Sequence, residues 1–349
     1  MSATGNVTQS TQSIPFIRRM LSPTWITIWL TVIVVIIVSV AKGPFVLVNS
    51  LVTGGMWALM AAGLALVFGV MNISNFAHGE FFMIGTLVAY FVFNSITKYL
   101  RQNPSPALAA IAPFAGIILA VVVGALLGFV IEKIIFSQLR RRSKEQWVMN
   151  TFLLTAGISV IMINGTLLIW GTKFKGVPRY WDVKPLDFFG VNLPIDRIVA
   201  FVIALITIVA FWFFMQRTGI GRAMRAVAQD EVGAQMLGID LNLVYTLTLS
   251  LSSALAALAG ASLLFMFPSY PTVGLKPLYV AWYVVILAGL GNVQGAIAGG
   301  FIVALLQTLT SYFIGPGWED VVPTALIILI LLFKPSGLFG SEVKGVWEQ

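Results

Sequence analysis

The chain has 349 residues, of which 58% are hydrophobic and only 10% charged, and its formal net charge is +8. Ordinary soluble domains carry about 25% charged residues, so this composition, with a mean hydropathy of +0.94, excludes a soluble globular protein. Cysteine is absent and histidine occurs once, which excludes disulfides, thiolate metal sites and multi-histidine metal sites.

The hydrophobic runs predict an all-α polytopic membrane protein. A spanning helix needs about 20 apolar residues, because its backbone must satisfy its hydrogen bonds internally, and the continuous runs lack the alternation of a membrane β-barrel. Two of the runs, 278–290 and 321–333, are short, so they must lie among other helices, borrow flanking residues or be broken or re-entrant elements. The ten predicted spans are residues 25–41, 45–70, 76–97, 107–136, 148–170, 198–215, 243–267, 278–290, 296–314 and 321–333.

The positive charge indicates how the chain is oriented. The basic residues lie in loops, which fits anionic lipid and orientation signals better than nucleic acid. The cluster in 140–144 predicts a cytoplasmic loop at 132–147 and places both termini in the cytoplasm. Residues 1–24 then form a polar cytoplasmic tail, and 341–349 form another. The run 25–41 is an additional N-terminal span, although its end, Ser39-Val40-Ala41, also resembles a signal-peptide cleavage site.

Residues 71–80 join two apolar runs and contain the only histidine, His78. An ionisable residue at membrane depth costs roughly 2.5 to 3.5 kcal/mol on insertion scales, so it faces the bundle interior, a water-filled cavity or a partner. His78 and Glu80 are two residues apart and cannot face each other on one helix. We expect Asn72 or Asn75 to cap the next helix, with Glu80 in its first turn. The segment either lines or gates a translocation path, or fixes how two helices enter the membrane.

A short internal similarity is consistent with an inverted repeat, which would place a transport site at the repeat interface. Four residues recur at an offset of 197, although such matches are close to chance in this composition. They are Ala62, Gly63, Leu66 and Phe68, matched by Ala259, Gly260, Leu263 and Phe265.

Two loops have compositions that predict structure. Residues 171–197 contain three prolines and several aromatic residues, which favours a structured external cap able to receive a partner. In 216–242 we expect a short helix with Arg222 and Arg225 on one polar face. Asp230 would cap a second helix, 231–237, which Gly238 would end in the left-handed conformation. Two such helices form a docking knob, unless they are an interfacial loop that only fixes topology.

The stretch 287–300 is rich in glycine, which permits a tight turn and close helix packing. It has no downstream lysine of a phosphate loop. No G-x-S-x-G motif surrounds any serine of the chain, and no zinc-protease or paired acidic motif lies within a span. The spans contain almost no acidic residues, which argues against a proton- or ion-coupled carrier. We therefore expect no enzymatic activity and no bound cofactor or metal, with the energy supplied from elsewhere or transport passive.

Three ordered motifs carry a family resemblance. Residues 75–80 (NFAHGE), 219–239 and 289–296 (GLGNVQGA) closely resemble the permease subunits of ABC importers for branched-chain and other neutral amino acids. The similarity runs from about residue 46 to 340, which defines a permease domain, 44–340. The run 25–41 looks like an addition that many relatives lack.

The resemblance implies a membrane half-channel in the bacterial plasma (inner) membrane. Its expected partners are a second permease subunit, two ATP-binding subunits that use the ATP, a periplasmic or extracellular substrate-binding protein, and lipid. The implied path or gate residues are Asn72, Asn75, His78, Glu80, Gly289, Gly291, Asn292 and Gly295. The implied ATPase-coupling residues are Gly219, Gly221, Arg222, Arg225, Asp230 and Gly238. The loop 171–197 would contribute to docking the binding protein.

Three other functions remain as alternatives. Urea- or amide-type permeases of the same family share the His-Gly-Glu segment and the glycine loop. A stand-alone secondary transporter or channel would need coupling residues or a pore that works without partners. A membrane-embedded enzyme would need a catalytic set that the sequence does not display.

Overall fold

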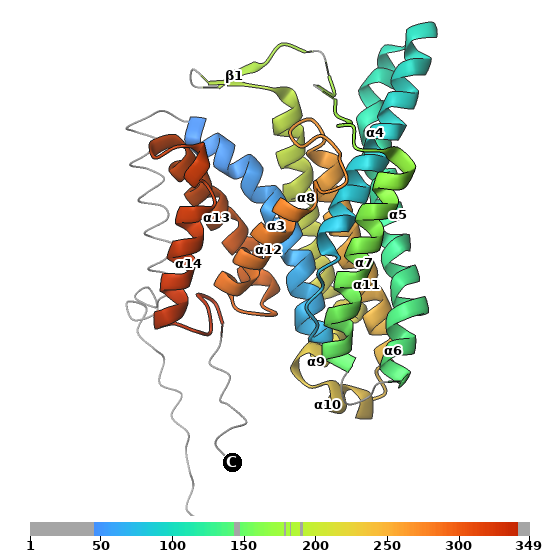
Figure 1. Cartoon of the computed structure of the whole chain (residues 1–349), viewed down its shortest axis with the longest axis vertical. Coiled ribbons are helices and arrows are strands. Elements are labelled where there is room, and N and C mark those ends of the chain that lie inside the picture. Colours follow the sequence, from blue (N-terminus) through green and yellow to red (C-terminus); the bar gives the residue numbers. More distant parts are fainter. Residues whose placement is uncertain (1–44, 143–146, 178, 182, 189–190, 341–349) are drawn as a thin grey trace, which may run out of the picture.

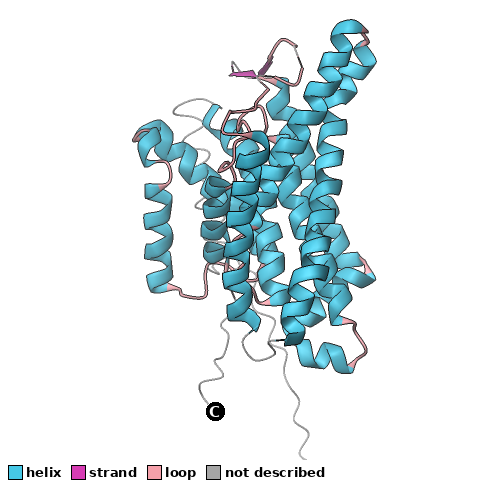
Figure 2. Cartoon of the chain, turned by 45° about the vertical axis from the view of Figure 1, so that its right-hand side comes forward, coloured by secondary structure: helices cyan, strands magenta, loops and turns pink. Residues whose placement is uncertain are grey.

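The computed structural model describes residues 45–142, 147–177, 179–181, 183–188 and 191–340. The predicted tails, 1–24 and 341–349, and the predicted first span, 25–41, lie outside this range. Within it almost every element is a helix (Figure 2), and a single hairpin is formed by β1 (Leu186–Phe188) and β2 (Val191–Leu193). The predicted all-α fold is therefore confirmed for these residues.

The helices follow one another with short connections. In chain order they are α3 (Phe45–Met71), α4 (His78–Gln102), α5 (Pro106–Ile131), a π-helical turn (Glu132–Phe136), α6 (Ser137–Arg142), α7 (Trp147–Trp170), α8 (Ile195–Arg217), α9 (Gly219–Gln229), α10 (Glu231–Met236), α11 (Leu241–Ser262), α12 (Leu275–Ala288), α13 (Val293–Phe313), a 3₁₀ turn η2 (Pro316–Trp318) and α14 (Val321–Phe333).

Eight helical segments of the described chain are long and apolar enough to cross a membrane. They correspond to eight of the nine spans predicted there. The ninth, α12, has only 14 residues and lies among other helices, with Val280, Val284 and Val285 buried. The other short span, α14, gains length from η2 and becomes an 18-residue segment, Pro316–Phe333. Both outcomes were among those expected for runs of 13 residues.

The two ends of the bundle carry different structures. The β1–β2 hairpin lies at one end, and α9 and α10 lie at the other (Figure 1). Helix α3 runs from the hairpin end to the α9 end, whereas α11 runs in the opposite direction (Figure 1). The predicted cap, 171–197, and the predicted knob, 216–242, therefore occupy opposite ends of the bundle.

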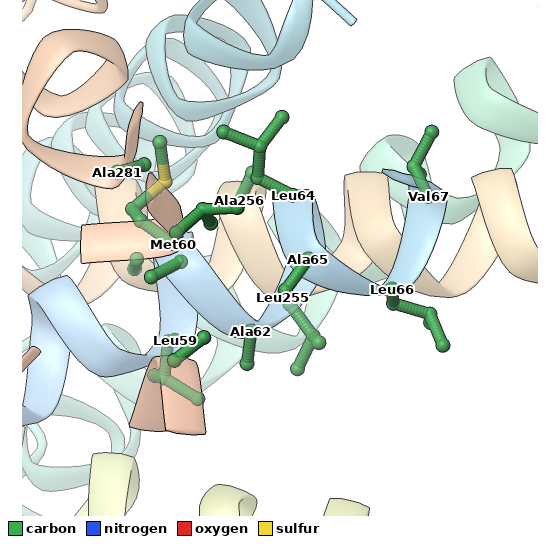
Figure 3. Packing of buried hydrophobic residues seen from close by; sticks show 14 of the residues in the cluster. Leu59, Met60, Ala62, Leu64, Ala65, Leu66, Val67, Leu255, Ala256 and Ala281 are labelled. Carbon is green, nitrogen blue, oxygen red and sulfur yellow. The ribbon is translucent and has the colours of Figure 1, made fainter. Parts of the chain in front are cut away.

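Helix α3 forms the centre of the core. It packs against α8, α11, α12 and α13, and from Met56 to Val67 only Gly63 interrupts a run of fully buried apolar side chains. Figure 3 shows part of α3 together with Leu255 and Ala256 of α11 and with Ala281 of α12, which is drawn beside Met60. Because van der Waals packing drives helix association in lipid, this alternation of large and small residues fixes the neighbours of α3.

Small residues allow α4, α5 and α11 to approach closely. A Cβ at Gly85 of α4 would overlap the backbone of Ala257 on α11, and a Cβ at Gly124 of α5 would lie 2.5 Å from the Ala257 side chain. By contrast, α5, α7, α8 and α14 expose many large apolar side chains, such as Leu168 and Phe333. These outer faces suit contact with lipid or with another apolar helix.

Two helices begin in the middle of the bundle. The Nε2 atom of His78, the first residue of α4, lies 3.0 Å from the carbonyl oxygen of Met60, which is 11 residues before the end of α3. The start of α12 packs against the start of α4, because Gly274 and Gly79 meet backbone to backbone. Helix α4 begins at residue 78 and α12 at residue 275, an offset of 197. This offset equals that of the sequence matches and supports the inverted repeat.

We predict that Gly85→Ala lowers the thermal stability of the purified protein, because the added methyl group must displace the α11 backbone. The expected cost is about 1 to 3 kcal/mol. Gly157→Ala in α7 is the matched control, since no atom lies within 4 Å of a Cβ at that position. Thermal unfolding in detergent would measure the difference, and equal melting temperatures for the two variants would contradict the packing described here.

Candidate functional site

The segment between α3 and α4 differs from its prediction in one respect. Neither Asn72 nor Asn75 caps α4, because that helix begins at His78 and its N-cap, Ala77, has no side-chain cap. Asn72 instead follows the end of α3 in the left-handed conformation, with φ +53°, and its backbone N–H donates a hydrogen bond to Phe68 O. The Asn75 side chain accepts a hydrogen bond from the Ala77 amide at 3.1 Å, just outside the helix.

His78 and Glu80 face different neighbours, as their spacing predicts. His78 is fully buried, with its ring nitrogens 3.0 Å from Met60 O and 3.4 Å from Ser252 Oγ, so it contacts both α3 and α11. Glu80 lies in the first turn of α4, as predicted, and accepts a hydrogen bond from Ser159 Oγ of α7 at 2.6 Å. The geometry thus shows both side chains joining helices at the break; their role in a path or gate stays a prediction.

The glycine loop between α12 and α13 has the tight turn that its composition predicts. Gly289 and Gly291 have φ of +99° and +80°, a region that favours glycine. Asn292 caps α13, because its Oδ1 accepts a hydrogen bond from Gly295 N at 2.8 Å. The loop also lies against the end of α3, where a Cβ at Gly69 would be 2.8 Å from Gly291 O.

The C-terminal segment 336–340 closes over this loop. Leu338 N donates to Leu287 O at 2.7 Å, Phe339 N donates to Ala288 O at 3.1 Å, and Asn292 Nδ2 donates to Phe339 O at 2.8 Å. The sequence similarity extended to this segment, but nothing in its pattern predicted that it would pair with the loop.

The predicted knob consists of α9 and α10. Thr218 caps α9, and Asp230 caps α10 by accepting a hydrogen bond from Gly233 N at 2.9 Å, as predicted. Gly238 has the predicted left-handed conformation, with φ +83°. Gly219 is exposed at the start of α9, whereas Gly221 packs so closely on α8 that a Cβ would overlap its backbone.

The two knob arginines do not share one exposed face. Arg222 is exposed, and its guanidinium donates to Arg217 O. Arg225 is partly buried and donates both to Met215 O and, at 2.9 Å, to Gln216 Oε1. The two arginines are three residues apart on one helix, as predicted. The end of α8, however, supplies hydrogen-bond acceptors that hold the Arg225 side chain within this chain.

The knob and the glycine loop border one another across three adjoining cavities of about 200, 550 and 440 Å³. Ala228 of α9 and Gly291 line all three, and Asn72 lines the last of them. Of the predicted path residues, Asn72, Gly289, Gly291 and Asn292 therefore border cavities. Asn75, His78, Glu80 and Gly295 are packed between elements instead.

Sequence reasoning missed two buried acidic residues. Glu132 is fully buried, with Arg140 Nη2 2.9 Å from its Oε1 and Thr246 Oγ1 2.6 Å from its Oε2. Asp196 is buried and accepts a hydrogen bond from Tyr180 N at 2.6 Å. The expectation of few buried acids was therefore wrong, but both carboxylates have partners that make them structural. In the described part of the chain no cluster of three or more potential metal ligands occurs.

The loop 171–197 is anchored rather than loose. Lys175 pairs with Ser269 through their backbones, and the Tyr180 hydroxyl donates to Ala261 O at 2.6 Å. Burial, together with the nearby Asp196, raises the pKa of Tyr180, so its hydroxyl stays protonated and can donate. A fourth cavity, of about 510 Å³ and with polar residues in its lining, lies beside this loop. Arg197, Lys276 and Glu319 contribute to that lining.

We predict that Asn292 stabilises the glycine loop through two separable contacts. Asn292→Asp keeps the oxygen that caps α13 but loses the donor to Phe339, whereas Asn292→Ala loses both. We expect both variants to lower the melting temperature, with Ala the more severe, by about 1 kcal/mol for the lost cap alone. Gln294→Ala, at an exposed neighbouring position, is the control. Equal stability of Asn292→Ala and the control would contradict this account.

Comparison with known proteins gives a consistent family match. The family model described as "Branched-chain amino acid transport system / permease component" matches residues 46–331. The permease protein BraD of a high-affinity branched-chain amino acid transport system in Pseudomonas aeruginosa is 30% identical over 309 residues, covering 86% of this chain and 97% of BraD. LivH of Escherichia coli K12, named as a permease of the same kind, is 29% identical, covering 85% of this chain and 96% of LivH.

A more distant relative is LivM of Escherichia coli K12, also named as a permease protein of a high-affinity branched-chain amino acid transport system. It is 23% identical over 299 residues, covering 81% of this chain and 67% of LivM. No solved structure matches the chain.

Proposed function

The chain belongs to the branched-chain amino acid transport permease family, and from that premise we propose that it is the membrane permease subunit of an ATP-driven importer. Its cargo would be branched-chain or other neutral amino acids. Its partners would be a second permease subunit, two ATP-binding subunits and an external substrate-binding protein. It would lie in the bacterial plasma membrane with both termini in the cytoplasm, bind no cofactor and leave ATP hydrolysis to its partners.

The observation that carries this proposal is the exposed apolar surface of the knob. Met236 and Leu237 are 83% and 84% exposed, and Val232 is 62% exposed, at an end of the bundle where α9 and α10 project beyond the spanning helices. Side chains of this kind outside a membrane mark an interaction site. The same two helices also expose the polar residues Arg222, Asp230 and Glu231, and polar side chains are typical of the rim of an interface.

The arrangement behind the knob supports coupling. Helix α9 is fixed to α8 by Arg225 and by the close contact at Gly221, so a displacement of the knob acts on a spanning helix. The cavities between α9 and the glycine loop leave room for such a displacement. Closure of the ATP-binding subunits would then bias the permease between two arrangements, one open to each side.

We predict that the double variant Met236→Asp, Leu237→Asp no longer binds the ATP-binding subunits, because two carboxylates would have to be desolvated at the interface. Their recovery with the affinity-purified permease should fall about tenfold or more. Val183→Asp, at an exposed apolar position near the opposite end, is the matched control. Unchanged recovery with the double variant would favour the interfacial-loop alternative.

We predict that the complete complex and the isolated chain differ in solute accumulation when each is reconstituted in liposomes. The complete complex, with binding protein and ATP, should accumulate leucine or isoleucine against a gradient, whereas this chain alone should not. Parallel uptake of labelled urea separates the amino acid importer from the urea-type alternative. Accumulation by the isolated chain would contradict the proposal and indicate a stand-alone transporter.

A further inference from the structure

A polar cavity lies at the hairpin end of the bundle, and neither the knob nor the glycine loop contributes to its lining. It has a volume of about 510 Å³ and is lined by α3, α8, the segment after α11, α12, α13 and the residue that follows η2. Asn49, Thr53 and Trp57 follow one another at four-residue spacing along α3, which places them on one face of that helix. Polar side chains from several separate elements thus converge on one space within a largely apolar bundle.

The cavity contains a guanidinium that has no carboxylate partner among the described residues. Arg197 is partly buried, and its Nη1 donates to the neutral Asn49 Oδ1 at 2.8 Å. The adjacent carboxylate, Asp196, is directed to Tyr180 N instead. The other basic residue of the cavity, Lys276, is neutralised by Glu319 at 2.7 Å and Asp320 at 3.4 Å. Arg197 therefore retains a positive charge and donors suited to a carboxylate.

The remaining lining supplies the other features of an amino acid. Glu319 and Asp320 carry two negative charges against the single positive charge of Lys276, so Glu319 can also accept a hydrogen bond from an ammonium group of the ligand. Trp57, Met266 and Phe267 provide an apolar wall, in which the Trp57 and Phe267 rings lie 6.2 Å apart. The Trp57 ring is held in place, because its Nε1 donates to Gln307 Oε1 at 2.9 Å.

The position of the cavity links it to the break in the helices. Met266 and Phe267 lie in the connection from α11 to α12, and Lys276 lies in the first turn of α12. Helix α12 itself begins in the middle of the bundle beside α4. Arg197 lies directly after the β1–β2 hairpin, within the loop expected to receive the binding protein. The cavity thus lies between the hairpin end, where Asn49 meets Arg197, and the centre of the bundle, where Met60 meets His78.

We propose that this outer cavity binds a free zwitterionic amino acid, with its carboxylate on Arg197, its ammonium group on Glu319 and its aliphatic side chain against Trp57 and Phe267. The proposal rests on the proposed transport function and assigns the permease a recognition site of its own. Its ligand class is an α-amino acid with an apolar side chain, and urea lacks both charged groups.

The test uses the permease and ATP-binding subunits assembled in lipid nanodiscs without the binding protein. Saturation-transfer NMR measures the binding of L-leucine, of leucinamide, which lacks the carboxylate, and of 4-methylpentanoate, which lacks the ammonium group. Leucine should bind saturably, and each analogue should bind about tenfold or more weakly, because leucinamide offers no carboxylate to Arg197 and 4-methylpentanoate offers no ammonium group to Glu319. Equal binding of leucine and leucinamide would overturn the proposal.

Two variants locate the site. Arg197→Gln removes the cation, and Asn49→Asp keeps the contact to Arg197 but satisfies it with an internal carboxylate. Both should weaken leucine binding about tenfold or more. Arg179→Gln, at an exposed position of the same loop, should leave binding unchanged. Nanodisc assembly with the ATP-binding subunits confirms that each variant is folded.

The outcomes separate the site from the transport function. Unchanged leucine binding by assembled Arg197→Gln, or no saturable binding by the wild type, would overturn the site. ATP-driven leucine uptake by the complete wild-type transporter would leave the transport function intact in either case. Leucine binding that both variants abolish, without ATP-driven uptake by the complete system, would support the site and contradict the importer.

Discussion

The structure depends on how the backbone is satisfied where two helices are interrupted inside the membrane. Extended peptide groups at that depth are costly unless protein atoms bond them, because no bulk water is present. Here the interruptions after α3 and after α11 are brought to one place, where Gly79 and Gly274 touch. Side chains from neighbouring helices complete the arrangement, as when Thr155 Oγ1 accepts a hydrogen bond from Phe76 N at 3.2 Å. A side chain at either glycine would separate the two helix starts and expose those groups.

The two interrupted connections reach the centre of the bundle from opposite ends of the molecule. The connection after α3 starts at the knob end, where Asn72 borders a cavity, and the connection after α11 comes from the hairpin end, where Phe267 borders another. The packed centre between them, around His78, separates the two cavities. An alternating-access cycle requires such a division, since a path open to both sides at once would leak. An inverted repeat, which the shared offset of 197 residues supports, would supply this division by placing similar elements in opposite orientations.

Much of this arrangement was predictable from the sequence because it depends on local patterns. Apolar run length predicted the spans, and Asp230 and Gly238 predicted the ends of the knob helices through capping chemistry. Three features were not predictable, since they depend on contacts that only the folded arrangement of the helices creates. The carbonyl oxygen of Met215 and the side chain of Gln216 turn Arg225 inward, Met60 and Ser252 hold His78, and Asn49 meets Arg197 from 148 residues away. The cap expected at Asn72 or Asn75 was wrong because the chain continues to the middle of the bundle before α4 begins.

The segment 336–340 is made late in synthesis, although it completes a turn that is made earlier. Its two backbone bonds to Leu287 and Ala288 complete the glycine loop, yet it lies at the end of the described chain. Translation proceeds from the N-terminus, so α3 to α14 are all made before the residues that finish this loop. A ribosome that stops before residue 336 would leave the carbonyl groups of Leu287 and Ala288 without these two partners. Such a truncation would therefore disturb the glycine turn without removing any spanning helix of the described chain.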